Sequence, residues 1–184
     1  MSPILGIWAS GIQPSLNGGS YDSIATVTVG SGGQSTITFS SIPSTYKHLQ
    51  IRGIARDAGG NGEWKIELNS DTTTTNYYRH GIYGDGASAS AFGVNNNTVA
   101  PVSYSGQTAS VFGGYVVDIL DYTNTNKYKT IRTLGGYDTN GGGQEGLFSN
   151  LWKNTNAITD ISLKIVGGTN FAQYSQFALF GIKG

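Results

Sequence analysis

The chain has no cysteine among its 184 residues, which excludes disulfide bonds and thiolate zinc sites. Only four prolines interrupt it, and only 12% of its residues are charged. The 11 Lys and Arg residues balance 11 Asp and Glu residues, so the chain lacks the basic surplus typical of nucleic-acid-binding proteins. Stability is therefore expected to come from packing or assembly, and the surface contacts should depend little on salt.

Side chains that act as acids, bases or metal ligands are also scarce. His48 and His80 are the only histidines, and the sequence contains no nucleophile elbow, paired-histidine zinc motif or phosphate-binding loop. We therefore expect no enzymatic activity, no metal and no cofactor. One catalytic alternative stays open, because the two carboxylates of a glycoside hydrolase need only meet in space. Its candidate residues are Glu63, Glu67, Asp118 and Asp121.

The first 20 residues, MSPILGIWASGIQPSLNGGS, join an apolar half to a tether rich in Gly and Ser. They contain no Lys or Arg, unlike a secretory signal, and the apolar run falls far short of the roughly 20 residues that span a membrane. A docking arm is therefore expected, with an edge strand on the chain's own domain as the alternative. The residues expected to bind a partner are Pro3, Ile4, Leu5, Ile7, Trp8 and Ile12.

From residue 21 to residue 184, strand patterns follow one another at short intervals. Alternating β-branched residues predict strands at 23–29 and 35–39, joined through GSGG as a hairpin. Residues 85–107 form a long run of small polar residues, and this run is expected to be a contact loop. Further strands are predicted at 48–56, 63–69, 110–122, 127–138, 147–152, 157–166 and in the closing YSQFALFGIKG.

These strands predict one all-β domain over residues 21–184, preceded by an extended N-terminal arm at 1–20. No stretch longer than about ten residues keeps the spacing of an amphipathic helix. Roughly eight to ten strands with Gly, Asn and Ser turns indicate an antiparallel β-sandwich. A jelly roll with two sheets of about four strands fits best. An immunoglobulin-like topology is the weaker option, because the Cys–Trp–Cys signature is absent.

Aromatic residues leave one binding alternative. Flat rings can stack on sugar rings, and Asn and Thr side chains can bind hydroxyl groups, although aromatic residues in sandwich strands are more often core residues. The candidate glycan-stacking residues are Trp64, Tyr77, Tyr78, Tyr83 and Trp152.

Four segments carry a family resemblance: PILGIWASGI, YDSIATVTVGSGGQSTITFSSIPSTYKHLQIRGIAR, DILDYTNTNKYKTIRTLGGYD and FAQYSQFALFGIKG. Together they resemble a group of tailed-bacteriophage virion proteins. The resemblance covers most of the chain and is specific for a component of the phage particle. It implies either a capsid decoration protein, of the cement or knob type, or a domain of a tail fibre or spike. Decoration proteins of this sort are usually small β-rich trimers on the capsid lattice.

The function implied by this resemblance is a capsid decoration protein that binds the outside of the capsid lattice through its arm and stabilises the head. It is preferred to a complete tail fibre because no long shaft precedes the PILGIWASGI segment. The implied partners are the major capsid protein and neighbouring copies in a homotrimer, with no nucleic acid and no membrane. The protein would be made in the host cytoplasm and located on the outer surface of the capsid. The alternative is a receptor- or glycan-binding domain of a tail fibre or spike.

Overall fold

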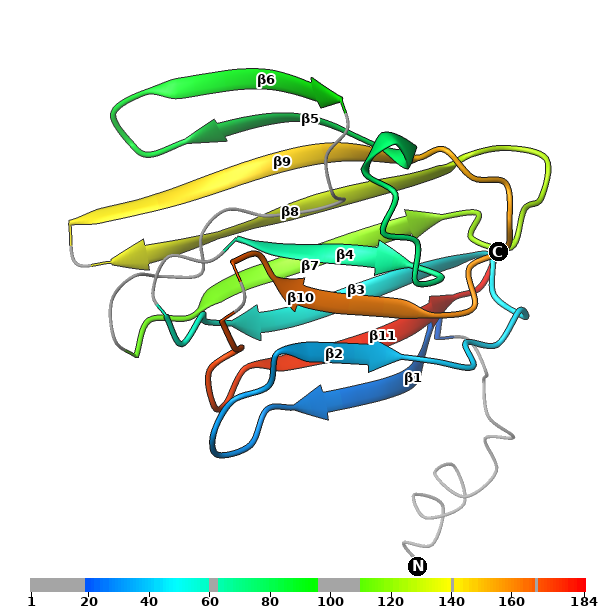
Figure 1. The fold of residues 1–184 in the computed structure, drawn as a ribbon, viewed down its shortest axis with the longest axis horizontal. Coiled ribbons are helices and arrows are strands. Elements are labelled where there is room, and N and C mark those ends of the chain that lie inside the picture. The colour runs from blue at the N-terminus through cyan, green and yellow to red at the C-terminus, as the bar shows by residue number, and fades with distance from the viewer. Residues whose placement is uncertain (1–18, 60–62, 96–109, 140, 168) are drawn as a thin grey trace, which may run out of the picture.

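The computed structural model describes residues 19–59, 63–95, 110–139, 141–167 and 169–184. Within them the chain forms two antiparallel β-sheets (Figure 1). The larger sheet has eight strands in the order β1-β11-β3-β7-β8-β9-β5-β6, and the smaller has three in the order β2-β10-β4. The strands are β1 (Tyr21–Thr28), β2 (Thr36–Phe39), β3 (His48–Ala55), β4 (Trp64–Leu68), β5 (Tyr77–Gly84), β6 (Ala89–Asn95), β7 (Gly113–Leu120), β8 (Lys129–Thr139), β9 (Gly142–Trp152), β10 (Ile161–Ile165) and β11 (Gln176–Ile182), and a 3-10 turn at Thr74–Asn76 precedes β5.

Successive strands alternate between the two sheets at both ends of the described chain. β1 and β3 belong to the larger sheet and β2 and β4 to the smaller one, while β10 and β11 again lie in different sheets. The predicted hairpin of the first two strands is therefore wrong: β1 pairs with β11, and β2 pairs with β10. The glycine-rich turn between them, where Gly32 and Gly33 have φ of 88° and 76°, carries the chain across the sandwich.

The all-β antiparallel class is confirmed, but the two sheets are unequal, and a jelly roll with about four strands in each sheet is not confirmed. The β8–β9 and β5–β6 hairpins enlarge one sheet on one side only. β6 lies within residues 85–107, which were expected to be a loop. Most side chains of this strand are exposed, so its small residues do not show the alternation of apolar and polar residues that indicates a strand. Residues 96–109 lie outside the described residues.

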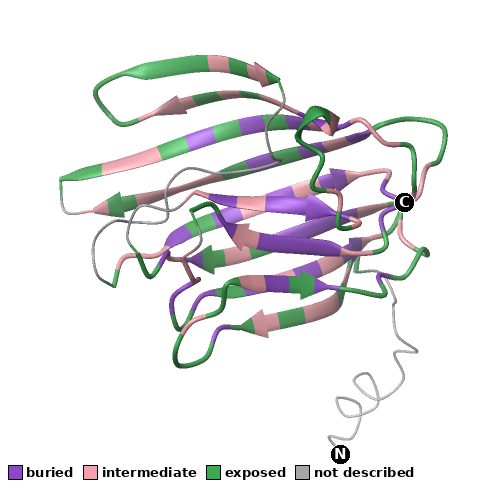
Figure 2. Cartoon of the chain, viewed as in Figure 1, coloured by how far each residue is buried: buried purple, intermediate pink, exposed green. Residues whose placement is uncertain are grey.

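The hydrophobic core lies where the two sheets overlap (Figure 2). Trp64 of β4 is one of its two largest side chains and is fully buried. The Trp64 ring meets Tyr115 of β7 at 5.3 Å and Phe177 of β11 at 5.5 Å between ring centroids, both edge to face. Such aromatic contacts join three strands from both sheets and stabilise the sandwich beyond the burial of apolar area.

Strands β8, β9, β5 and β6 extend beyond the smaller sheet (Figure 1). On the inner side of this extension, the Phe92 and Phe148 rings pack at 5.9 Å between centroids. They lie over Gly81, where an added Cβ would be only 2.4 Å from the Phe148 ring. The missing side chain of Gly81 thus makes room for rings from both neighbouring strands, and these rings cover the inner side of the extension.

A buried lysine holds two loops at one end of the sandwich. The Lys129 side chain is fully buried, and its Nζ donates hydrogen bonds to the carbonyl oxygens of Asn124 (2.6 Å), Lys127 (3.1 Å) and Thr155 (3.0 Å). Burial lowers the pKa of Lys129. Because all three ammonium protons have acceptors, this lysine has a structural role in tying the β7–β8 loop to the segment after β9.

Candidate interaction surface

One face of the eight-stranded sheet points away from the smaller sheet; we call it the outer face. Side chains of a strand alternate between the two faces of its sheet. Along β7 the inward-facing Tyr115 and Val117 are buried, whereas Val116 and Asp118 on the outer face are only half-buried. The strand register therefore gives the position of every residue on the outer face.

A row of apolar residues crosses this face. Val116 pairs with Leu134, Leu134 with Leu147, Leu147 with Ile82, and Ile82 with Ala91. The three large side chains at its centre are about half exposed: 54% for Leu134, 49% for Leu147 and 57% for Ile82. Contiguous exposure of this kind marks a contact surface more strongly than scattered single residues do. We call these five residues, on β7, β8, β9, β5 and β6, the apolar row.

A row of polar residues runs beside it, two positions along each strand. Asp118 pairs with Arg132, Arg132 with Ser149, and Ser149 with His80. Oδ1 of Asp118 accepts a hydrogen bond from Nε2 of Gln50 at 2.7 Å, which fixes the carboxylate at the surface. Arg132 is exposed and forms no ion pair with any residue of the described chain. We call Asp118, Arg132, Ser149 and His80 the polar row.

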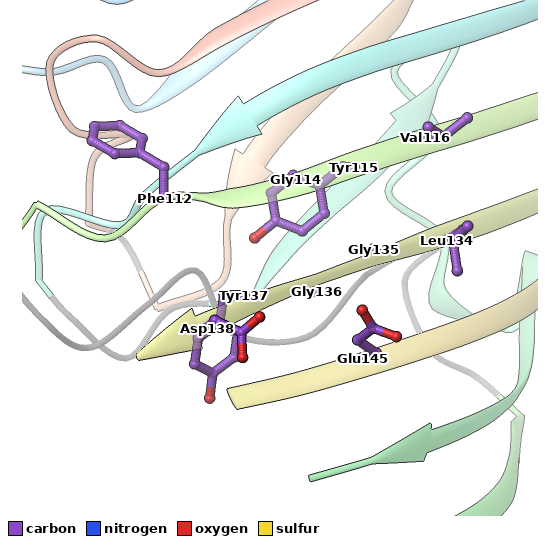
Figure 3. A pocket seen from close by; sticks show the side chains of 10 residues that line it. All are labelled: Phe112, Gly114, Tyr115, Val116, Leu134, Gly135, Gly136, Tyr137, Asp138 and Glu145. Atoms are coloured by element: carbon purple, nitrogen blue, oxygen red, sulfur yellow. The ribbon is translucent and has the colours of Figure 1, made fainter. Parts of the chain in front are cut away.

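A hollow of about 550 Å³ adjoins the other side of the apolar row (Figure 3). It lies where two glycines, Gly114 and Gly136, are paired on β7 and β8. The Glu145 side chain and the Leu134 side chain also line it (Figure 3). A Cβ at Gly114 would meet nothing within 4 Å, so space remains above the backbone. The outer face thus presents a glycine-lined hollow, an apolar row and a polar row in succession.

A separate ionic cluster surrounds Asp121 at the end of β7. Its carboxylate forms ion pairs with Lys127 and with Lys47, whose Nζ lies 3.0 Å away. These contacts, with Lys127 the larger cause, lower the pKa of Asp121 to about 2. The Asp121 backbone N–H donates to Nδ1 of His48 at 2.9 Å, so this nitrogen acts as an acceptor. The cluster holds the end of β7 against the start of β3.

The residues expected to bind a partner through the N-terminal arm lie outside the described residues. The structure therefore leaves the docking arm a prediction. These residues are Pro3, Ile4, Leu5, Ile7, Trp8 and Ile12.

The aromatic residues expected to stack on sugars do not form one site. Trp64, Tyr77 and Trp152 are core residues with exposed fractions of 0%, 1% and 0%, so none has a ring face at the surface. Tyr78 and Tyr83 are half-buried on β5, but their positions differ by an odd number, which places them on opposite faces of the sheet. Each already has a partner: the Nζ of Lys153 lies 4.4 Å from the Tyr78 ring centre, and Tyr83 packs against Phe92.

The candidate carboxylates for glycoside hydrolysis are engaged in ion pairs or hydrogen bonds. Glu63 Oε1 accepts from Arg79 at 3.0 Å. Burial raises the pKa of Glu67, but Lys164 and Lys65 bind its carboxylate and lower the pKa below its ordinary value. The described residues contain no group of three His, Asp or Glu side chains placed to hold a metal. Among the same residues, no helix has the length and apolar character to cross a membrane.

The fold defines an all-β, two-sheet antiparallel protein whose outer face exposes a row of apolar side chains. No family model matches the chain, and neither a curated protein nor a solved structure matches it. The outer face itself was not predicted from the sequence, although Leu134 shares its strand face with polar Thr130 and Arg132, an irregularity typical of a contact residue.

Proposed function

We propose that the chain is a bacteriophage capsid decoration protein, with residues 1–20 as the arm that binds the outer surface of the capsid lattice. It stabilises the head as a structural protein, with no catalytic step and no cofactor. Its partners are the major capsid protein and neighbouring copies in a homotrimer. The finished protein is located on the virion after synthesis in the host cytoplasm.

The observation that carries this proposal is a core sealed by residues after the arm. The buried core extends from Val29 to Leu179, and its largest side chains, Trp64 and Trp152, are fully buried. The described residues therefore supply a hydrophobic core of their own, and we assign the apolar segment at 4–12 to a different contact. That segment is then available to a neighbouring protein, as the resemblance to phage virion proteins implies.

We also propose that the sandwich is an elaborated jelly roll. The alternation of β1, β2, β3 and β4 between the two sheets supports this topology, as does the insertion of β11 between β1 and β3 and of β10 between β2 and β4. The β5–β6 and β8–β9 hairpins are additions to one sheet. They create the part of the outer face that carries Leu147 and Ile82.

The alternative is a receptor- or glycan-binding domain of a tail fibre or spike. It is the weaker proposal, because three of its five aromatic residues are buried and the other two lie on opposite faces of β5. Copies per virion separate the two functions: a number that matches the capsid lattice supports decoration, and one that matches the tail supports a receptor-binding domain. A glycan array with the purified chain tests the sugar directly.

Deletion of residues 1–20 tests the arm. We expect the shortened chain to stay folded, with the strand content and unfolding midpoint of the full chain, and to lose binding to purified capsids. A triple variant, Ile4→Ser, Leu5→Ser and Trp8→Ser, should behave in the same way, whereas Ser15→Ala with Asn17→Ala in the tether should bind normally. Full occupancy of capsids by the deleted chain would refute the proposed function.

A further inference from the structure

The outer face exposes three large apolar side chains, Leu134, Leu147 and Ile82, in one row across neighbouring strands. Burying about half of each side chain on a partner is favourable, because apolar area leaves water. The partner must also match the polar row, in which Asp118 and Arg132 lie opposite each other on adjacent strands. Oppositely charged residues next to an apolar row specify one arrangement of the partner.

Rotation about an axis parallel to the strands keeps every residue at its height along the axis. Copies arranged around such an axis, with their outer faces inward, therefore bring the apolar row of one copy to the apolar row of the next. Each copy carries Asp118 and Arg132 at the same position along β7 and β8, so this arrangement lets Arg132 of one copy reach Asp118 of its neighbour. The exposed guanidinium of Arg132, which has no ion-pair partner in the described chain, gains a carboxylate in this arrangement.

The hollow beside the apolar row also fits this arrangement. At Gly114 of β7 an added Cβ would meet nothing within 4 Å, so this position leaves room for side chains of neighbouring copies. The five strands of the apolar row, about 4.8 Å apart and each about seven residues long, give this part of the face an area of about 550 Å². Three copies together would then bury about 1,600 Å², within the roughly 1,200–2,000 Å² of total surface that specific interfaces bury.

We infer that the outer face joins three copies of this chain around an axis parallel to β7 and β8. The apolar row forms the apolar layer of the contact, and Arg132 of each copy pairs with Asp118 of the next. The number three rests on the proposed function, and the contact surface rests on the register and charges of the outer face. The arm at residues 1–20 is not needed for this contact and remains available to the capsid.

The test uses the full chain and measures its mass in solution by sedimentation equilibrium. The wild-type chain is expected at three times the chain mass. Arg132→Asp places like charges around the axis and should give the mass of one chain, as should Leu147→Glu in the apolar row. The double variant Asp118→Arg with Arg132→Asp restores opposite charges and should return the mass to three chains. Val166→Lys, at an exposed apolar residue outside the outer face, is the matched control and should remain a trimer.

Circular dichroism confirms that each variant is folded before its mass is interpreted. A wild-type monomer or dimer overturns the inference, as does a trimer that survives both Arg132→Asp and Leu147→Glu. Failure of the double variant to reassemble would refute the pairing of Arg132 with Asp118. Capsid decoration is tested separately: a trimer that does not bind capsids would keep this contact and refute decoration, whereas a monomer that binds capsids would keep decoration and refute the trimer.

Discussion

The indole N–H of Trp152 donates a hydrogen bond to Oδ2 of Asp71 across 2.7 Å. Trp152 ends β9 in the larger sheet, and Asp71 follows β4 of the smaller sheet, so this bond ties the two sheets together. The Asp71 carboxylate also accepts from Nδ2 of Asn76 (2.8 Å) and from the backbone N–H of Thr73 (2.9 Å). Burial raises the pKa of Asp71, but these donors outweigh burial and lower the pKa below its ordinary value.

Asp71→Ala is expected to lower the free energy of unfolding by about 1–3 kcal/mol, because the buried indole N–H of Trp152 loses its acceptor. Urea unfolding followed by tryptophan fluorescence measures the change. The control is Asp85→Ala, which removes a carboxylate that accepts from Ala87 and Ser88 in an exposed turn. The control should lose less stability, and equal losses in the two variants would contradict the role given to Asp71.

Asp121 makes stability depend on acid pH. Its pKa is about 2 rather than 3.8, so the folded state favours the carboxylate, and this contribution is full above pH 3.8 and disappears as the pH falls through 2. Asp121→Asn is expected to lower the free energy of unfolding at pH 7 by about 1 kcal/mol or less, since Lys47 and Lys127 are more than half exposed. Asn is suitable because it tolerates the φ of 46° at this position.

Unfolding of both forms at a series of pH values checks this expectation. The difference between the wild type and Asp121→Asn should be largest near neutral pH and should vanish toward pH 2. A difference that stays constant over this range would show that the carboxylate charge has no part in the effect.

Two glycines on paired strands should respond differently to the same substitution. A Cβ at Gly81 would lie 2.4 Å from Cδ1 of Phe148 and 3.1 Å from Cε1 of Phe92, whereas a Cβ at Gly93 would lie 3.7 Å from its nearest atom, Cδ2 of His80. Gly81→Ala is therefore expected to cost about 1–3 kcal/mol through overpacking. Gly93→Ala should stay within about 0.5 kcal/mol of the wild type. Thermal unfolding of the two variants compares them, and the reverse order would refute the packing described over Gly81.

Lys129→Met is expected to lower the free energy of unfolding by about 2–3 kcal/mol, because three loop carbonyl oxygens lose their donor. The control, Lys127→Met, removes an exposed lysine that pairs with Asp121 and should cost less than about 1 kcal/mol. Chemical denaturation measures both. Similar costs for the two substitutions would contradict a structural role for the buried ammonium.

Much of the fold is predictable from local alternation. β4 and β7 bury an apolar side chain at every second position, from Trp64 to Leu68 and from Tyr115 to Ile119. Pairing is not predictable in this way. Residues 30–33 look like a hairpin turn, because a short glycine-rich turn has the same composition whether it joins neighbours in one sheet or crosses between two.

The candidate surface was harder to predict, because a contact residue on a sheet face has the same apolar side chain as a core residue. Leu147 and Phe148 are adjacent in the sequence, yet one is about half exposed and the other is buried. Only the strand register separates them. Burial also explains why Trp64 and Trp152 were assigned to a possible sugar site: aromatic composition alone does not distinguish a core ring from an exposed one.

The place of β11, between β1 and β3, has a consequence for biosynthesis. The larger sheet lacks one of its inner strands until residues 176–182 have left the ribosome, and then β11 must pair with β1 and β3, which were made much earlier. Such distant pairing is slow to form. The larger sheet therefore cannot close before β11 is made, and until then the edges of β1 and β3 stay open to chaperones and to other nascent chains.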